Sequence, residues 1–179
     1  AAIDETTAQT ITKDAIAGIE SGDLQQGTDG RWSGAPSLQG YGSDTETIRD
    51  VVLSYFDEAG IAITVQQESH ILGECYECHG GWAIYGQIIE EKDRFLLYTI
   101  RYPRIPVDKY PQVSEFLHRA NYGTPLGNFE MDYKIGEVRY KTSIAVEKGH
   151  LSREMVNHMF RACLVLMNYY TPGLDMVVY

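Results

Sequence analysis

Residues 129–146 read FEMDYKIGEVRYKTSIAV and carry the clearest strand pattern in the chain. Apolar and polar side chains alternate along both halves of this segment, as they do in strands that bury one face. Gly136 lies between the two halves and marks a tight turn. We therefore expect a β-hairpin whose first strand starts at Phe129 and whose second strand runs from Val138 to Val146.

Three more strands are expected upstream of this hairpin. In residues 61–66, every second side chain is Ile or Val, which predicts a strand with one buried face. After an irregular stretch, Trp82–Ile89 repeats the alternation. Phe95–Tyr102 is apolar on both faces, which is typical of a central strand.

Two helices are expected from apolar side chains that recur at helical spacing. The first spans Asp44–Ala59, and Ser43 followed by Glu46 fits a capping box at its start. The second spans Asp108–Asn121, with Asp108 itself as the N-cap. Both helices have one apolar stripe, so each should pack against a sheet with one side only.

A third helix is expected to start at Ser152, a good N-cap residue. Its apolar side chains cover more than one stripe, which predicts burial on more than one side, in the core or at a subunit interface. Pro172 and Gly173 should end it, because proline cannot continue a helix without losing a backbone hydrogen bond. Asp175–Tyr179 could then form a short edge strand.

These elements predict an α+β domain in the order α-β-β-β-α-β-β-α, with an antiparallel sheet of about five strands and three helices. Residues 1–42 differ from the rest, because they are rich in Gly, Ser, Thr and Gln. We expect an N-terminal arm over residues 1–42, partly loop, followed by one domain over residues 43–179.

Composition argues against several classes of function. The formal net charge is −10, and no run of Lys or Arg is present, so neither nucleic acid nor an anionic membrane is an expected partner. The longest apolar runs are too short to span a bilayer. Three cysteines, an odd number, do not suggest a disulfide-stapled secreted fold, so the expected location is a reducing cytoplasm.

Several spaced motifs resemble those of the YbjN family of bacterial sensory transduction regulators. The most specific segment is residues 116–140. It holds Phe116-Leu117, Asn121-Tyr122, Leu126-Gly127-Asn128-Phe129-Glu130 and Gly136-Glu137-Val138-Arg139-Tyr140. The motif Tyr170-Thr171-Pro172-Gly173 is similar to the one that ends the last helix of that family. The resemblance runs from about Arg49 to Val178, and it does not map residues 1–42 or an insertion around residues 69–81.

The resemblance implies a fold similar to that of type III secretion chaperones, which are small, acidic, usually dimeric proteins that hold a partner segment without catalysis. We therefore expect a non-enzymatic protein-binding domain, chaperone-like or adaptor-like, that forms a homodimer and needs no cofactor. A regulatory role in bacterial signalling or stress response is what the family label implies. A small-molecule enzyme or sensor is a third hypothesis, which a bound ligand or a deep polar pocket would favour.

An alternative function comes from the motif Cys75-Tyr76-Glu77-Cys78-His79. C-x-x-C-H is the attachment pattern of c-type haem, but haem attachment follows export and no export signal is visible. A zinc site on Cys75, Cys78 and His79, with His70 as fourth ligand, lacks the usual second pair of ligands. A redox dithiol lacks a thioredoxin-like context. The remaining interpretation is two ordinary small residues beside a strand.

The last helix supplies the candidate partner-binding or dimer residues. They are Met155, Met159, Phe160 and Met167. Methionine side chains adapt to varied partners and are frequent on promiscuous binding surfaces, although core packing explains the same pattern. No nucleophile has a base and an orienting group nearby in the sequence, so no catalytic residue is expected.

Overall fold

The computed structural model describes residues 46–66, 69–75, 82–146 and 150–179. The helices are α2 (Ile48–Glu58), α3 (Tyr110–Asn121) and α4 (Arg153–Val178). The strands are β1 (Ile63–Gln66), β2 (His70–Cys75), β3 (Trp82–Ile89), β4 (Arg94–Arg101), β5 (Asn128–Asp132) and β6 (Glu137–Ala145). Two short 3-10 turns, η1 (Glu90–Lys92) and η2 (Val107–Lys109), complete the described elements.

The strands form one antiparallel sheet in the order β1-β2-β3-β4-β6-β5. The predicted α+β class, the three helices and the antiparallel sheet are therefore confirmed. The expected hairpin is β5–β6, with Gly136 in its turn at φ 70°. The strand that is apolar on both faces, β4, lies in the interior of the sheet between β3 and β6, as predicted.

The described sheet has six strands rather than about five, because the stretch expected to be irregular contains β2. Its sequence, HILGEC, includes a glycine and a glutamate and does not alternate clearly. β2 pairs along its whole length with β3 and along four residues with β1. Pairing with two neighbours thus defines this strand, which its own pattern does not predict.

Helix α2 starts later than expected. Thr47 is the N-cap: its side chain accepts a hydrogen bond from the Asp50 N–H, while the Asp50 carboxylate accepts one from the Thr47 N–H. This capping box replaces the one predicted on Ser43 and Glu46; Ser43 lies outside the described residues. Helix α3 is likewise preceded by η2, so Asp108 lies in a 3-10 turn and is not the N-cap.

Helix α4 begins after Ser152, whose side chain accepts a hydrogen bond from the Met155 N–H, as predicted. It does not end at Pro172 but continues to Val178, so the expected edge strand at residues 175–179 is wrong. An interior proline costs about 3 kcal/mol. Here Leu174 and Val178 extend the buried face of the helix beyond the proline, and their burial opposes that cost.

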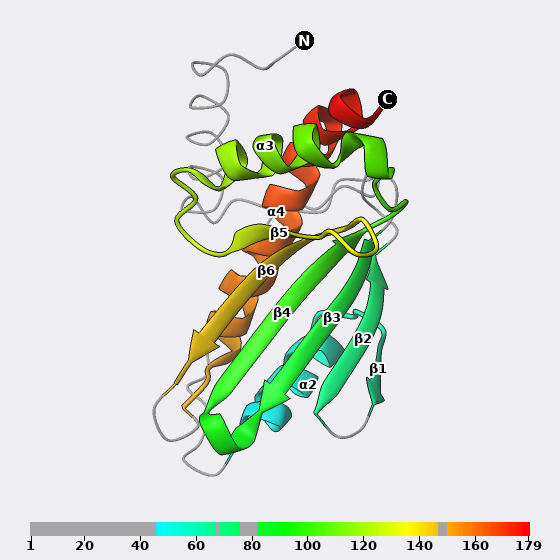
Figure 1. Cartoon of the computed structure of the whole chain (residues 1–179). Coiled ribbons are helices and arrows are strands. Elements are labelled where there is room, and N and C mark those ends of the chain that lie inside the picture. The colour runs from blue at the N-terminus through cyan, green and yellow to red at the C-terminus, as the bar shows by residue number, and fades with distance from the viewer. Residues whose placement is uncertain (1–45, 67–68, 76–81, 147–149) are drawn as a thin grey trace, which may run out of the picture.

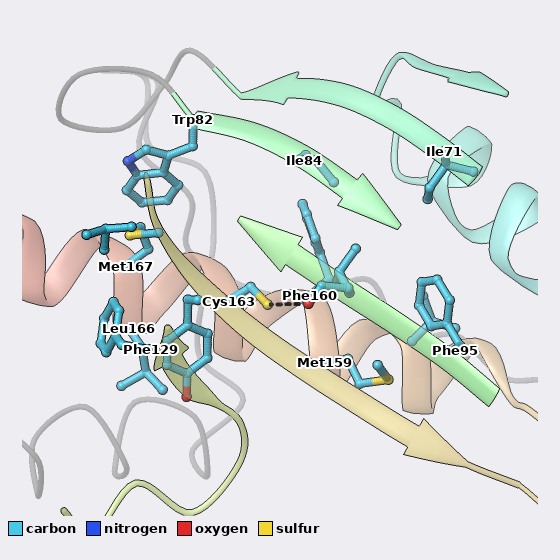
Figure 2. Packing of buried hydrophobic residues seen from close by; sticks show 14 of the residues in the cluster. Ile71, Trp82, Ile84, Phe95, Phe129, Met159, Phe160, Cys163, Leu166 and Met167 are labelled. Atoms are coloured by element: carbon cyan, nitrogen blue, oxygen red, sulfur yellow. Dashed lines mark hydrogen bonds between the residues drawn. The ribbon is translucent and has the colours of Figure 1, made fainter. Parts of the chain in front are cut away.

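The core lies between one face of the sheet and the helices α2 and α4 (Figure 1). Strands β3, β4 and β6 bury every second side chain on this face, including Ile84, Phe95 and Tyr140. Figure 2 shows Phe160 and Cys163 on α4 next to the strands that carry Ile84 and Phe95. α3 crosses the end of the sheet next to α4 and β5 (Figure 1).

Candidate binding face on the sheet

The opposite face of the sheet has no described helix or strand over it, and Figure 1 looks onto it. We call this surface the open face. In a sheet with one solvated face, the outward positions are normally polar. On β3 and β4 they are mostly apolar instead. The outward apolar side chains of these two strands are Ala83, Tyr85, Ile89, Leu96, Tyr98 and Ile100.

A row of rings crosses the middle of the open face. His70 on β2 stacks on Tyr85 of β3, with the ring centroids 5.6 Å apart and 23° between the planes. Tyr85 lies 5.7 Å from Tyr98 on β4. The guanidinium of Arg139 on β6 sits over the Tyr98 ring, 4.6 Å from its centroid. The row therefore spans four adjacent strands and ends in a cation–π contact.

A charged cluster borders this row on β5 and β6. Glu130 accepts hydrogen bonds from Arg139 Nε, at 3.0 Å, and from the Lys141 ammonium, and it forms ion pairs with both side chains. Burial raises the pKa of Glu130, but the hydrogen bonds from Lys141 and Arg139 outweigh it, so the pKa lies below its usual value. Glu130 thus stays ionised at neutral pH and holds the two cations in place.

The environment of Tyr85 also differs from that of a free tyrosine. Burial raises the pKa of its hydroxyl, Tyr98 adds to this effect and Arg139 opposes it. The hydroxyl is therefore a neutral hydrogen-bond donor at physiological pH, not a phenolate. Tyrosine and arginine, which form this row, are enriched in the hot spots of protein interfaces.

The structure places three of the four predicted helix residues in the core. Met159, Phe160 and Met167 are each less than 5% exposed. Phe160 packs edge-on against Phe56 of α2, with the ring centroids 5.4 Å apart. Met155 differs, since it is 41% exposed in the first turn of α4. Among these four residues, only Met155 offers a partner substantial surface, and its role stays a prediction.

The predicted metal or haem residues are not brought together in the described part of the chain. Cys78 and His79 lie outside the described residues, and Cys75 is the last residue of β2. His70, proposed as a fourth ligand, stacks on Tyr85 and hydrogen-bonds to Ser69 at 2.9 Å. No group of three His, Cys, Asp or Glu in residues 46–66, 69–75, 82–146 and 150–179 could hold a metal ion.

Cys163 is the one cysteine whose surroundings are described in full. It is completely buried on α4, and its sulfur lies 3.4 Å from the Thr142 hydroxyl. Burial raises the pKa of this thiol to about 12, so almost no thiolate exists at neutral pH. Cys163 is therefore a packing residue and not a nucleophile.

The sequence patterns do not identify the open face, although one of them points to it. The segment that forms β4 is apolar on both faces, a pattern that predicts a central position in the sheet. Among the described residues, helices cover only one face of β4, so Leu96 and Ile100 on the other face remain half-exposed, whereas Tyr98 is buried between Tyr85 and Arg139. The partners Tyr85 and Arg139 follow from strand register, which the sequence does not fix.

The described residues thus form an α+β domain in which helices cover one face of the sheet and no described helix covers the other. A family model described as "Putative bacterial sensory transduction regulator", YbjN, matches residues 49–176, and the chain belongs to this family. We found no significant match among curated proteins. None of the described helices is both long and apolar enough to cross a membrane.

Three solved structures are similar to this chain. The crystal structure of YbjN from E. coli, described as "a putative transcription regulator", is 10% identical, with 70% of this chain and 92% of that chain covered and a TM-score of 0.52. The ExsC–ExsE complex gives 14% identity, 71% and 92% coverage and a TM-score of 0.42. An uncharacterized protein from Methanothermobacter thermautotrophicus is 15% identical, with 74% of this chain and 99% of that chain covered and a TM-score of 0.46.

Proposed function

We propose that this chain is a non-enzymatic protein-binding domain, chaperone-like or adaptor-like, that acts in bacterial regulation and binds its partner on the open face. The observation that carries the proposal is the apolar character of that face. Leu96, Tyr98 and Ile100 point away from the helices in the middle of the sheet. Leu96 and Ile100 are half-buried and Tyr98 is 8% exposed, so the surface that a partner can reach lies mainly over Leu96, Ile100 and Tyr85. An apolar patch bordered by charged side chains is typical of a protein-binding site.

The chemistry of the described residues supports binding rather than catalysis. Cys163 is a buried thiol whose pKa of about 12 keeps it protonated. The Glu130 carboxylate is occupied by Arg139 and Lys141, so it is held as a structural charge rather than as a free base. We further propose that the protein is a homodimer, works in the cytoplasm, and binds its partner through the domain formed by residues 43–179.

The test is affinity capture from native extract with two matched variants. Tyr85→Ala, Leu96→Ser removes apolar surface from the open face. Tyr122→Ala, Met155→Ser removes surface elsewhere, because Tyr122 is 80% exposed at the end of α3 and Met155 is 41% exposed on α4. Circular dichroism and thermal melts first establish that both variants are folded.

We expect one partner to be captured by the wild-type protein and the α3–α4 variant, and its recovery to fall at least tenfold with the open-face variant. The same loss with the α3–α4 variant alone would move the binding surface to the side of the molecule that carries Tyr122 and Met155. Equal capture by all three proteins would refute the open face as the binding site.

A further inference from the structure

The two edges of the sheet, β1 and β5, differ in how they are protected. An edge strand presents unpaired N–H and C=O groups that can pair with another chain. Proteins usually block such edges with charged residues, proline, bulges or a covering element. Among the described residues, the β5 edge is covered by a side chain and carries charged residues, whereas the β1 edge is protected only by being short.

The β5 edge is closed by a side chain from α3. The Asn121 Oδ1 accepts the Phe129 N–H at 2.6 Å, and the Asn121 Nδ2 donates to the Phe129 carbonyl at 3.0 Å. One amide thus satisfies both outward backbone groups of Phe129, the second residue of β5. A strand from another molecule cannot add there without displacing α3.

The β1 edge has no comparable protection in the described residues. Its four residues are Ile63, Thr64, Val65 and Gln66, of which three are β-branched and none is charged or proline. Val65 is 39% exposed. Within the described ranges, no hydrogen bond reaches the outer side of this strand, while its inner side pairs with β2. Its shortness is the one feature that limits pairing.

Charge also favours this edge as the place where two copies meet. The chain carries a net charge of −10, so two molecules repel each other over most of their surfaces. Residues 59–67, AGIAITVQQ, contain no charged side chain. The β5 edge, by contrast, carries Glu130 and Asp132. An approach along β1 therefore avoids direct contact between like charges.

We propose that β1 pairs antiparallel with β1 of a second copy of this chain, so that the two sheets become one across a two-fold axis. This inference rests on the homodimer part of the proposed function and names its interface. Pairing β1 with itself uses the same surface on both subunits and stops at two. Head-to-tail pairing of β1 with β5 would make open fibres, and Asn121 blocks it.

Strand geometry limits the register of this pairing. Directly opposed residues in an antiparallel pair point to the same face of the sheet, and a two-fold axis perpendicular to the sheet does not exchange its faces. Each residue of β1 must therefore lie opposite a residue that points to the same face. The condition is met when the axis passes between Thr64 and its own copy, or between Val65 and its own copy. These two registers pair the largest number of β1 residues. In both registers the helices of the two subunits lie on the same side, and the two open faces join into one continuous binding surface.

Disulfide trapping tests the register. The residue on the axis faces its own copy with a Cα–Cα distance of about 4.5–5.5 Å, which a disulfide can bridge. Thr64→Cys and Val65→Cys are made separately in a Cys75→Ser, Cys78→Ser background, with Tyr122→Cys as an exposed control. We expect rapid oxidation to a covalent dimer for one of the first two variants. Dimer formation by neither, or equally fast by the control, would overturn the proposal.

Sedimentation velocity tests the edge itself. Val65→Lys puts a charge on the edge and should raise the dimer dissociation constant at least tenfold, whereas Thr64→Val keeps a β-branched residue and should leave it unchanged. A dimer unaffected by Val65→Lys would overturn β1 pairing but leave the homodimer, whereas a monomeric wild-type protein would overturn both. Partner capture by a monomeric Val65→Lys protein would show that the open face still binds, so the two proposals can fail separately.

Discussion

The side-chain amide of Asn121 pairs with both backbone groups of Phe129, as a neighbouring strand would. This contact ties the last residue of α3 to the edge strand β5. It also positions the Phe129 ring, which packs edge-on against Tyr140 of β6 at 4.8 Å and Tyr170 of α4 at 5.4 Å between centroids. One polar side chain therefore joins α3, the sheet edge and the core.

Replacing Asn121 should affect both stability and association. Asn121→Leu keeps the volume but leaves two part-buried backbone groups unpaired, which costs about 1–3 kcal/mol. Urea unfolding measures this loss, and Tyr122→Ala, at an exposed neighbour, should change stability by less than about 0.5 kcal/mol. Because the β5 edge is then open, sedimentation should also show species larger than a dimer. Unchanged stability and unchanged size would show that the amide does not protect the edge.

The ion pair between Arg101 and Asp175 should stabilise the fold more than an exposed pair does. Arg101 is 3% exposed at the end of β4, and its guanidinium contacts the Asp175 carboxylate of α4. Asp175→Asn leaves that cation without its counter-charge, so we expect a loss of about 2–3 kcal/mol in urea unfolding. The control is Glu115→Gln, whose pair with Arg119 is exposed and should contribute less than about 0.5 kcal/mol. Equal losses of stability in Asp175→Asn and Glu115→Gln would show that burial of Arg101 does not strengthen its ion pair.

A buried thiol and two buried tyrosine hydroxyls should lower the stability of the fold at alkaline pH. The pKa of Cys163 is raised from 9.0 to about 12 by burial, so between these values the unfolded chain loses a proton that the folded chain keeps. Stability is therefore full below pH 9 and falls as the pH rises toward 12. Burial also raises the pKa of Tyr55 and Tyr140, which act in the same direction. Cys163 alone should cost about 1.4 kcal/mol at pH 10.

The Cys163→Ala variant separates the thiol from the two tyrosines. Its stability is lower at pH 7 because a cavity remains, but it should lose about 1.4 kcal/mol less than the wild type between pH 7 and pH 10. Urea unfolding at both pH values gives the two differences. Equal losses in the two proteins would show that Cys163 does not titrate in this range.

The sequence predicted the elements whose own pattern is strong. Alternation predicts β3 and the β5–β6 hairpin, a run that is apolar on both faces predicts β4, and Ser152 predicts the start of α4. The sequence patterns do not predict the elements that depend on tertiary contacts. β2 has no clear pattern and exists because β1 and β3 pair with it. α4 passes through Pro172 because Leu174 and Val178 are buried beyond it.

The candidate site shows the same limit. Apolar residues on several sides of a helix predict burial, but they do not say whether the covering surface belongs to the same chain or to a partner. In α4 the sheet and α2 cover Met159 and Phe160, while Met155 is exposed. On the open face, Arg139 meets Tyr98 only because β4 and β6 pair in a particular register. Register depends on the whole sheet, so a single strand pattern cannot predict that contact.

Two glycines with the same backbone conformation should respond differently to substitution. Gly60 after α2 has φ 67° and Gly136 in the β5–β6 turn has φ 70°. No atom of the described residues lies within 4 Å of a Cβ built on Gly60. A Cβ on Gly136 would collide with the Ile105 carbonyl oxygen and lie 2.9 Å from the Tyr110 hydroxyl. Gly60→Ala should therefore lower the free energy of unfolding by about 1–2 kcal/mol, because only the left-handed backbone conformation disfavours alanine there. Gly136→Ala should lower it by more, because the steric collision adds to that effect.

Asparagine separates the two causes, because it tolerates the left-handed conformation but still carries a Cβ. Gly60→Asn should recover much of the stability that Gly60→Ala loses, whereas Gly136→Asn should remain as unstable as Gly136→Ala. The Gly136 variants should also weaken the hydrogen bond from the Ile105 N–H to the Gly136 carbonyl, which is 2.8 Å long. Urea unfolding of the four variants, with hydrogen exchange at Ile105, measures both effects. Recovery by Gly136→Asn would mean that conformation, and not the close approach of Ile105, requires glycine at this turn.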